Sequence, residues 1–209
     1  LMKKTKRSKK SRTWVIKQHR DQFFKKSKVL GYRSRAAFKL IELNKKFNFI
    51  KKNSQLLDIG STPGGWSQAA SKIITNGKMV AIDKQPMEAV KKVTFFQCDI
   101  LDDKASDKIL NIFKSKIDVI VSDMAENTTG IKSTDSIRTN NLCMEVINIS
   151  LKLLNNKGTL VSKLFMGEDF LEVKDLAKKK FKKVEFFKPE SSRSESKETY
   201  IYCSILKTL

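Results

Sequence analysis

The chain is poor in the residues that most often bind zinc or form disulfides. It has one histidine, His19, and three cysteines, Cys98, Cys143 and Cys203, which are far apart and odd in number. A structural zinc site needs about four nitrogen or sulfur ligands, and no Cys-x-x-Cys pair is present, so we expect no metal. A disulfide framework does not fit either, which favours an intracellular, reducing compartment.

Long apolar runs are also missing. The sequence has no stretch of about eighteen apolar residues for a membrane span and no secretory signal. Residues 1–11 consist almost wholly of Lys, Arg, Ser and Thr and are predicted to be a disordered basic arm. A basic, acid-poor start is typical of transit peptides and of RNA-binding arms, so cytoplasm, mitochondrion or another organelle, and nucleolus all stay open.

Acidic residues are scarce relative to basic ones. The chain has 43 Lys and Arg against 22 Asp and Glu, a net charge of +21. Residues 1–35 hold fourteen of the basic residues and a single acid, Asp21. Such a field favours a polyanionic partner, above all a nucleic acid, over an anionic membrane. Since no repeat or linker interrupts the remainder, we predict one domain over residues 12–209 and a monomer.

The rest of the chain is organised around Leu56–Gln68, which reads Leu-Leu-Asp-Ile-Gly-Ser-Thr-Pro-Gly-Gly-Trp-Ser-Gln. This pattern predicts a strand, a glycine turn and a helix, the unit at which open α/β sheets bind nucleotide-like ligands. Its spacing, Asp58-x-Gly60-x-x-x-Gly64-Gly65 with no lysine after the glycines, matches neither a dinucleotide fingerprint nor a P-loop. It resembles the first motif of S-adenosylmethionine-dependent methyltransferases, whose ligand has no phosphates.

Three further strands are each followed by an aspartate. Met79–Ile82 leads to Asp83, Val93–Gln97 to Asp99, and Asp118–Ser122 to Asp123. Carboxyl ends of parallel strands share one edge of a sheet, where an acid after the second strand can accept hydrogen bonds from ribose hydroxyls. Asp99 is placed to accept from an adenine amino group.

The carboxyl-terminal half predicts three more strands. Thr159–Phe165 carries Lys163 in an apolar run, and burying an ammonium is costly unless it is paired. Val184–Lys188 and Glu198–Leu206 form a final hairpin-like pair. The whole pattern predicts a Rossmann-like α/β fold with a mainly parallel seven-stranded sheet, the last strand antiparallel, and helices on both faces. Helices are expected from Ser34 as N-cap, over Trp66–Thr75, over Ser136–Asn155 with a stop at Asn155–Gly158, and over Asp169–Lys180.

Five segments together resemble the FtsJ family of RNA 2′-O-ribose methyltransferases: Gly31–Leu40, Asp58–Gln68, Ser122–Ala125, Val161–Phe165 and Lys188–Arg193 with Ser196–Tyr200. The resemblance spans residues 12–206. It implies a catalytic tetrad of Lys39, Asp123, Lys163 and Glu198. It also implies S-adenosylmethionine contacts at Gly64, Trp66, Asp83, Asp99 and Asp123, to which the first motif adds Asp58, Gly60, Pro63 and Gly65. Where the family usually has proline after Ser-Asp-Met-Ala, this chain has Glu126, near the expected RNA site.

The resemblance implies methyl transfer to a ribose 2′-hydroxyl, a weak nucleophile that needs a base or an orienting group. Lys163 is the candidate, and the sequence does not decide between the two roles. Large-subunit ribosomal RNA, at a uridine, is the expected substrate. An anticodon-loop tRNA methyltransferase and an idle RNA-binding assembly factor remain alternatives. Phosphate contacts are expected from Arg33, Arg35, Lys3, Lys4, Lys6 and Arg7.

Overall fold

The computed structural model describes residues 21–126, 131–167 and 169–207. The predicted arm over residues 1–11 therefore lies outside the described residues, with Lys3, Lys4, Lys6 and Arg7. Seven strands form one sheet in the order β3-β2-β1-β4-β5-β7-β6. They are β1 (Gln55–Ile59), β2 (Lys78–Asp83), β3 (Thr94–Gln97), β4 (Ile117–Ser122), β5 (Leu154–Phe165), β6 (Phe181–Phe187) and β7 (Glu198–Leu206).

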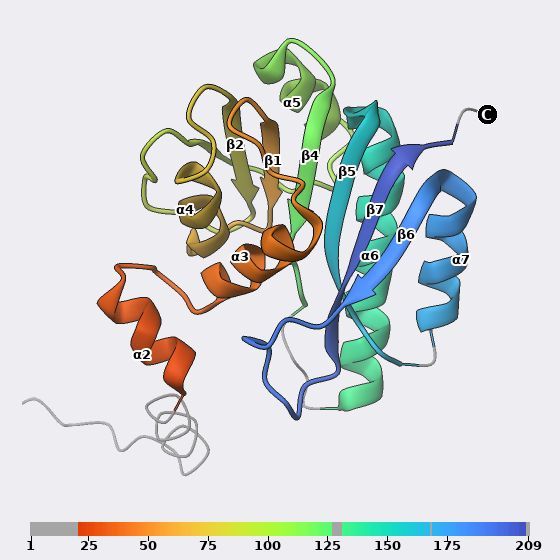
Figure 1. The fold of residues 1–209 in the computed structure, drawn as a ribbon. Helices are drawn as coiled ribbons and strands as arrows, with labels where there is room; N and C mark the ends of the chain where they lie inside the picture. The colour runs from red at the N-terminus through yellow and green to blue at the C-terminus, as the bar shows by residue number, and fades with distance from the viewer. Residues whose placement is uncertain (1–20, 127–130, 168, 208–209) are drawn as a thin grey trace, which may run out of the picture.

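The register of the strands confirms the predicted sheet. β1 to β5 pair in parallel, and β7 runs antiparallel to both of its neighbours, β5 and β6. The strand order turns back between β1 and β4, and ligands of open α/β sheets bind outside the carboxyl ends of the strands at such a point. In Figure 1 the carboxyl ends of β1 and β2 point down, toward the side on which α2 lies.

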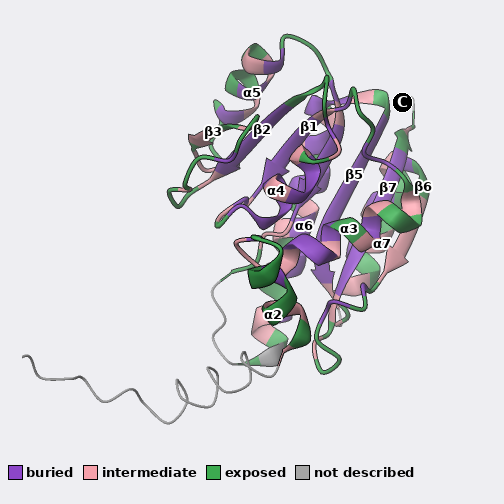
Figure 2. Cartoon of the chain, turned by 60° about the vertical axis from the view of Figure 1, so that its left-hand side comes forward, coloured by how far each residue is buried: buried purple, intermediate pink, exposed green. Residues whose placement is uncertain are grey.

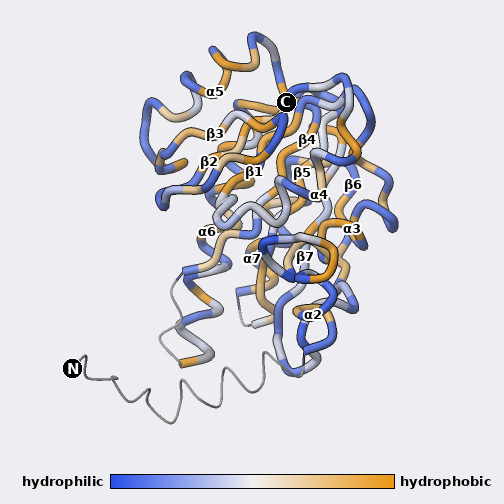
Figure 3. Tube along the Cα trace, turned by 90° about the vertical axis from the view of Figure 1, so that its left-hand side faces the viewer, coloured by the Kyte–Doolittle hydropathy of each residue, from blue (hydrophilic) through white to orange (hydrophobic). Residues whose placement is uncertain are grey.

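Helices cover both faces of the sheet, as predicted. One apolar cluster joins α3 (Ala36–Phe47) and α4 (Gly65–Ser71) to the sheet. The other joins α5 (Ala105–Phe113), α6 (Lys132–Leu153) and α7 (Phe170–Lys180) to the opposite face. Figure 2 shows the central strands buried between these layers, and Figure 3 shows hydrophobic residues concentrated along them. Helix α2 (Gln22–Val29) begins after Asp21, whose carboxylate caps it by accepting from the Phe23 and Phe24 amides.

Two local predictions differ from the structure. The N-cap of α3 is Arg35, and the Ser34 hydroxyl is buried without a hydrogen-bond partner, so the Ser34 cap is wrong. The predicted stop at Asn155–Gly158 lies inside β5, because α6 ends at Leu153 and the strand starts at the next residue. Helix α5 was not predicted. Within the described ranges, no helix is long and apolar enough to cross a membrane.

Candidate active site

A cavity of about 340 Å³ opens at the carboxyl edge of β1, β2, β3 and β4. Four of the predicted cofactor residues line it: Gly60, Asp83, Asp99 and Asp123. Apolar side chains that the sequence analysis did not single out form much of its wall. They come from the strand ends, from the residues that follow them and from α6, namely Ile59, Ile82, Ile100, Leu101, Met124 and Leu142.

The Asp83 carboxylate ties two loops of the cavity together. Its Oδ2 accepts from the Thr62 amide at 2.9 Å and its Oδ1 from the Gln85 amide at 2.8 Å. The Thr62 hydroxyl also donates to the Gln85 carbonyl. Each carboxylate oxygen can accept a further bond, so Asp83 is still able to bind hydroxyls of a ligand.

Asp99 lies across the cavity after β3. Its Oδ1 accepts from the Leu101 amide at 3.0 Å, and its Oδ2 pairs with the Lys84 ammonium at 2.8 Å. Partial burial raises the pKa of Asp99, but the hydrogen bonds from Lys84 and Leu101 outweigh it and hold the pKa below its ordinary value. The carboxylate is therefore ionised and can accept from an amino group.

The glycine turn is shaped by close contacts around it. Gly60 has φ of +72°, and a Cβ there would lie 2.4 Å from the Met124 side chain, so the turn needs glycine. Pro63, Gly64, Gly65 and Trp66 do not line the cavity. The Trp66 indole donates to the Ala36 carbonyl at 2.8 Å, which makes this residue a packing link between α4 and α3.

Asp58 also lies outside the cavity lining. It is fully buried, and its Oδ2 accepts from the Ser67 hydroxyl at 2.6 Å while its Oδ1 has no partner. Burial raises the pKa of this carboxyl to about 7, with smaller contributions from Asp123 and Asp83. The structure thus places Asp58 beneath the glycine turn, where it joins β1 to α4.

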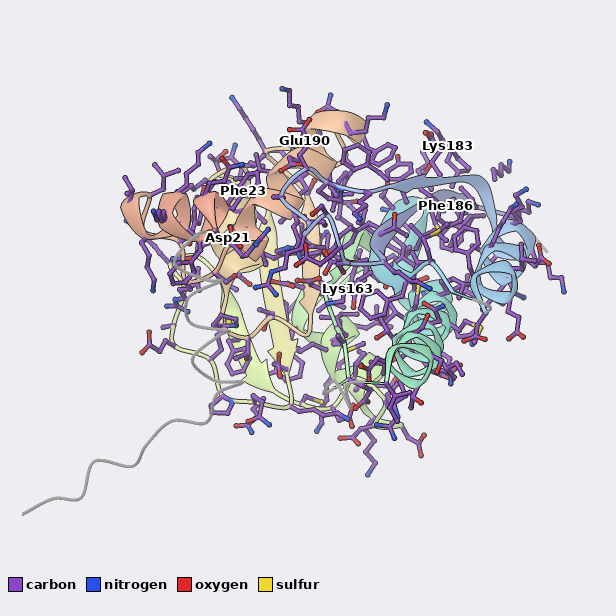
Figure 4. The ribbon with its side chains drawn as sticks, turned by 90° about the horizontal axis from the view of Figure 1, so that it is seen from below. Asp21, Phe23, Lys163, Lys183, Phe186 and Glu190 are labelled. Atoms are coloured by element: carbon purple, nitrogen blue, oxygen red, sulfur yellow. The ribbon has the colours of Figure 1, made fainter. Side chains whose placement is uncertain are left out.

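The predicted tetrad is brought together beside this cavity. Lys163, only 8% exposed, donates to the Asp123 carboxylate at 3.0 Å and to the Asp123 backbone carbonyl at 2.6 Å. Burial raises the pKa of Asp123, but Lys163 and Lys39 outweigh it and lower the pKa below its usual range. Figure 4 shows Lys163 toward the middle of the molecule, whereas Lys183 lies near the rim.

The second ion pair of the tetrad joins α3 to β7. The Lys39 ammonium contacts both carboxylate oxygens of Glu198, at 2.7 and 2.9 Å. Burial lowers the pKa of Lys39, but Asp123 and Glu198 together raise it above the ordinary value. Lys39 is therefore a fixed cation.

Two residues that the sequence analysis did not assign complete this network. The Tyr200 hydroxyl donates to Asp123 Oδ1 at 2.7 Å, and burial raises the pKa of this phenol well above its ordinary value. The Ser192 hydroxyl donates to Glu198 Oε1 at 2.7 Å. Both belong to segments that carried the family resemblance, but no local pattern marks either side chain as a partner of the tetrad.

The two predicted RNA-binding arginines that the structure describes, Arg33 and Arg35, differ in their surroundings. Arg35 forms an ion pair with Asp21 and donates to the Ser191 carbonyl. It lines a second cavity of about 500 Å³ together with Lys39, Arg193, Glu195, Ser196 and Glu198. Arg33 instead donates to three backbone carbonyls near the glycine turn. Asp21, Phe23 and Glu190, which Figure 4 labels, line a separate pocket that shares Arg35, Arg193 and Glu195 with the second cavity.

Glu126 lies on the rim of the first cavity, the one that Asp83 and Asp99 line. Its charge acts on Lys84 and contributes to raising the pKa of that lysine, after the hydrogen bond from Lys84 to Asp99. The substitution of glutamate for the usual proline thus adds a negative charge beside the predicted cofactor pocket.

Comparisons with known proteins agree with this arrangement. A relative from Pelagibacter ubique, a ribosomal RNA large subunit methyltransferase E, is 47% identical over 94% of this chain and 97% of its own length. The protein of the same name from Rickettsia akari is 41% identical over 94% of this chain and 89% of its own.

Solved structures show the same similarity. A crystal structure described as a ribosomal RNA methyltransferase from Plasmodium falciparum matches with a TM-score of 0.76 and 34% identity, over 84% of this chain and 98% of that one. Fibrillarin from Methanococcus jannaschii, at 18% identity and a TM-score of 0.56, shares the fold. The model of the FtsJ-like methyltransferase family matches residues 32–205, and the chain belongs to that family.

Proposed function

We propose that the protein transfers a methyl group from S-adenosylmethionine to a ribose 2′-hydroxyl of large-subunit ribosomal RNA. The observation that carries this proposal is the pairing of two sites at one sheet edge. An acid-lined cavity lies next to a buried arrangement of two lysines and two carboxylates, and Asp123 belongs to both. The printed names of the curated relatives support the ribosomal substrate.

The residues of the first cavity fit S-adenosylmethionine. Asp83, Asp99, Asp123 and Glu126 line it, and Lys84 already pairs with Asp99. A negative cavity suits a ligand with a sulfonium and an ammonium and disfavours a pyrophosphate. Asp83 would accept from the ribose hydroxyls and Asp99 from the adenine amino group, and Ile82, Ile100 and Leu142 would supply apolar wall for the base.

The tetrad would bind and orient the acceptor oxygen. Bound S-adenosylmethionine would supply a reactive methyl group on its sulfonium. An ammonium has three N–H donors. Lys163 uses two of them on Asp123, so one remains to hold the ribose oxygen. Lys39 and Glu198 fix each other on the side of the second cavity, where the flanking RNA would lie.

The RNA would approach from the side of the second cavity. Arg35 and Arg193 both line it, so these two cations share a space that suits a phosphate. Burial lowers the pKa of Arg35, and the nearby charge of Arg193 lowers it further. We also propose that the enzyme acts as a monomer, without a metal, in a reducing compartment. The free thiols of Cys98, Cys143 and Cys203 support that compartment.

The test is transfer of labelled methyl from S-adenosylmethionine to large ribosomal subunits or their RNA, compared with bulk tRNA. Label recovered in an alkali-resistant dinucleotide of ribosomal RNA is the expected result, because a 2′-O-methyl group blocks alkaline cleavage. Label in tRNA alone would contradict the ribosomal assignment and support the tRNA alternative. An absence of label, with the cofactor bound, would support the idle assembly factor and contradict the enzymatic proposal.

A further inference from the structure

We propose that Arg33 is a positioning residue for the cofactor turn, rather than a contact for RNA phosphates. This inference depends on the proposed function, because it names the ligand of the cavity as S-adenosylmethionine. It concerns a residue that does not line the cavity and that the sequence suggested as an RNA contact.

The Arg33 guanidinium bridges two loops with its fork of donors. Its Nη1 donates to the carbonyls of Pro63 at 3.2 Å and Glu88 at 2.6 Å, and its Nη2 donates to the carbonyl of Ala89 at 2.7 Å. Pro63 belongs to the glycine turn after β1, whereas Glu88 and Ala89 belong to the loop between β2 and β3. Guanidinium is suited to this because its planar donors are held in fixed directions.

These two loops form part of the cavity wall. Thr62 of the first and Gln85 of the second line it, and Asp83 joins them by accepting from both amides. Asp83 links the two loops by hydrogen bonds at the cavity, and Arg33 links them by hydrogen bonds a few residues further along the chain. With both links formed, the Asp83 carboxylate is held in one position for a ligand's hydroxyls.

The arginine is itself fixed from the side of α4. The Arg33 amide donates to the Gln68 side-chain oxygen at 2.8 Å, and the Gln68 side-chain nitrogen donates to the Gly31 carbonyl at 3.2 Å. Gly64, at φ +107°, leaves room for the guanidinium, since a Cβ there would lie 2.9 Å from Nη1. The contact of Arg33 with the Glu88 carboxylate, at 3.9 Å, adds little because that carboxylate is 92% exposed.

Substitution by lysine separates the two roles. Lysine keeps the charge and binds phosphates well, but it presents one compact ammonium that cannot reproduce the fork across two loops. If Arg33 contacts a phosphate, that contact therefore survives Arg33→Lys and is lost in Arg33→Met. If Arg33 links the two loops, the link is lost in both variants. Arg35→Lys is the matched control for cofactor binding, because Arg35 lies two residues on and contacts Asp21 and Ser191 instead.

The experiment measures S-adenosylmethionine affinity by titration calorimetry without RNA, and the salt dependence of RNA binding separately. Arg33→Lys and Arg33→Met are both expected to weaken cofactor affinity by roughly tenfold, the usual effect of losing a charge-assisted hydrogen bond. Turnover at saturating cofactor and the salt slope should stay close to wild type. Arg35→Lys should keep wild-type cofactor affinity.

Wild-type cofactor affinity in Arg33→Lys would overturn the inference. So would a salt slope reduced by about one unit in Arg33→Met with cofactor affinity unchanged, as a phosphate contact requires. Gln68→Ala keeps the Arg33 side chain but removes the acceptor of the Arg33 amide. This variant is expected to lower cofactor affinity a few-fold, and it provides the test if the Arg33 variants do not fold. If the wild type itself binds no S-adenosylmethionine, the proposed function fails instead.

Discussion

The two halves of the sheet edge differ in the partners of their carboxylates. In the cofactor half, formed by β1, β2 and β3, carboxylates accept from backbone amides, from a neutral hydroxyl or, in the case of Asp99, from the exposed ammonium of Lys84. In the tetrad half, formed by β4, β5, β7 and α3, each carboxylate faces a buried ammonium.

The buried Asp58 and the partly buried Asp123 show what this difference does. Asp58 has only the Ser67 hydroxyl as side-chain partner, and burial raises its pKa to about 7. Asp123 is held ionised by Lys163 and Lys39 despite its burial. Local partners hold the carboxylates of the proposed cofactor cavity, whereas the paired charges of the tetrad come from segments far apart in the chain.

The largest expected effect is that of Lys163→Ala. Removing this ammonium should lower methyl transfer by roughly 10²- to 10⁴-fold, the range over which a positioned acid, base or orienting group contributes. Lys183→Ala is the matched control, because Lys183 is a half-exposed lysine of β6 paired with Glu185. Incorporation of labelled methyl measures the turnover of both variants. Near-normal turnover in Lys163→Ala would contradict the proposed difference between the two halves.

Asp58→Asn tests how a buried carboxyl group without a cationic partner affects stability. Between its ordinary value of 3.8 and about 7, the folded chain binds more protons at this residue than the unfolded chain, so wild-type stability falls as pH rises through that window. The variant does not titrate there. Its unfolding free energy relative to wild type should therefore rise across the window, by up to about 4 kcal/mol. Denaturant unfolding at several pH values measures this, and a difference independent of pH would contradict it.

Tyr200→Phe sharpens the comparison inside the tetrad half. The ring keeps its packing against Trp66, while Asp123 loses one of its donors. We expect about a tenfold fall in turnover, since a hydrogen bond to a charged group is involved. Cofactor affinity should be unchanged. A variant with wild-type turnover would show that Lys163 alone positions Asp123.

The smallest expected effect is that of removing residues 1–12, which carry seven of the basic residues. RNA affinity should fall at low salt, and the salt dependence should flatten, because each lost phosphate contact lowers the slope by about 0.9. Binding measured across a salt series is the readout. An unchanged slope would show that the arm does not contact RNA.

The same contrast explains what the sequence could predict. Asp83 ends β2 and Asp99 lies two residues after β3, and each accepts from an amide two residues further on, so a local pattern found them. The tetrad comes from positions 39, 123, 163 and 198, and without the family resemblance only Asp123, at a strand end, and Lys163, in an apolar run, stood out. The guanidinium of Arg33 binds carbonyls 30 to 56 positions away, which no periodicity reveals.

The local errors have similar causes. Asn155–Gly158 has the composition of a helix stop, yet β5 pairs with β4 at Leu154 and again from Thr159, so these residues form an irregular stretch inside the strand. Ser34 is a favourable cap by type, but its side chain lies against Gly65 of α4, where a Cβ would come within 2.3 Å of the hydroxyl. Tertiary contacts decided both positions.

The most direct test compares Lys163→Ala with Asp83→Asn, measuring for each the S-adenosylmethionine dissociation constant and the single-turnover rate of methyl transfer at saturating cofactor. The account predicts that Lys163→Ala binds the cofactor normally and loses the rate, while Asp83→Asn binds it at least about tenfold more weakly and keeps a near-normal rate. Parallel losses of affinity and rate in both variants would contradict the division of the sheet edge into a cofactor half and a tetrad half.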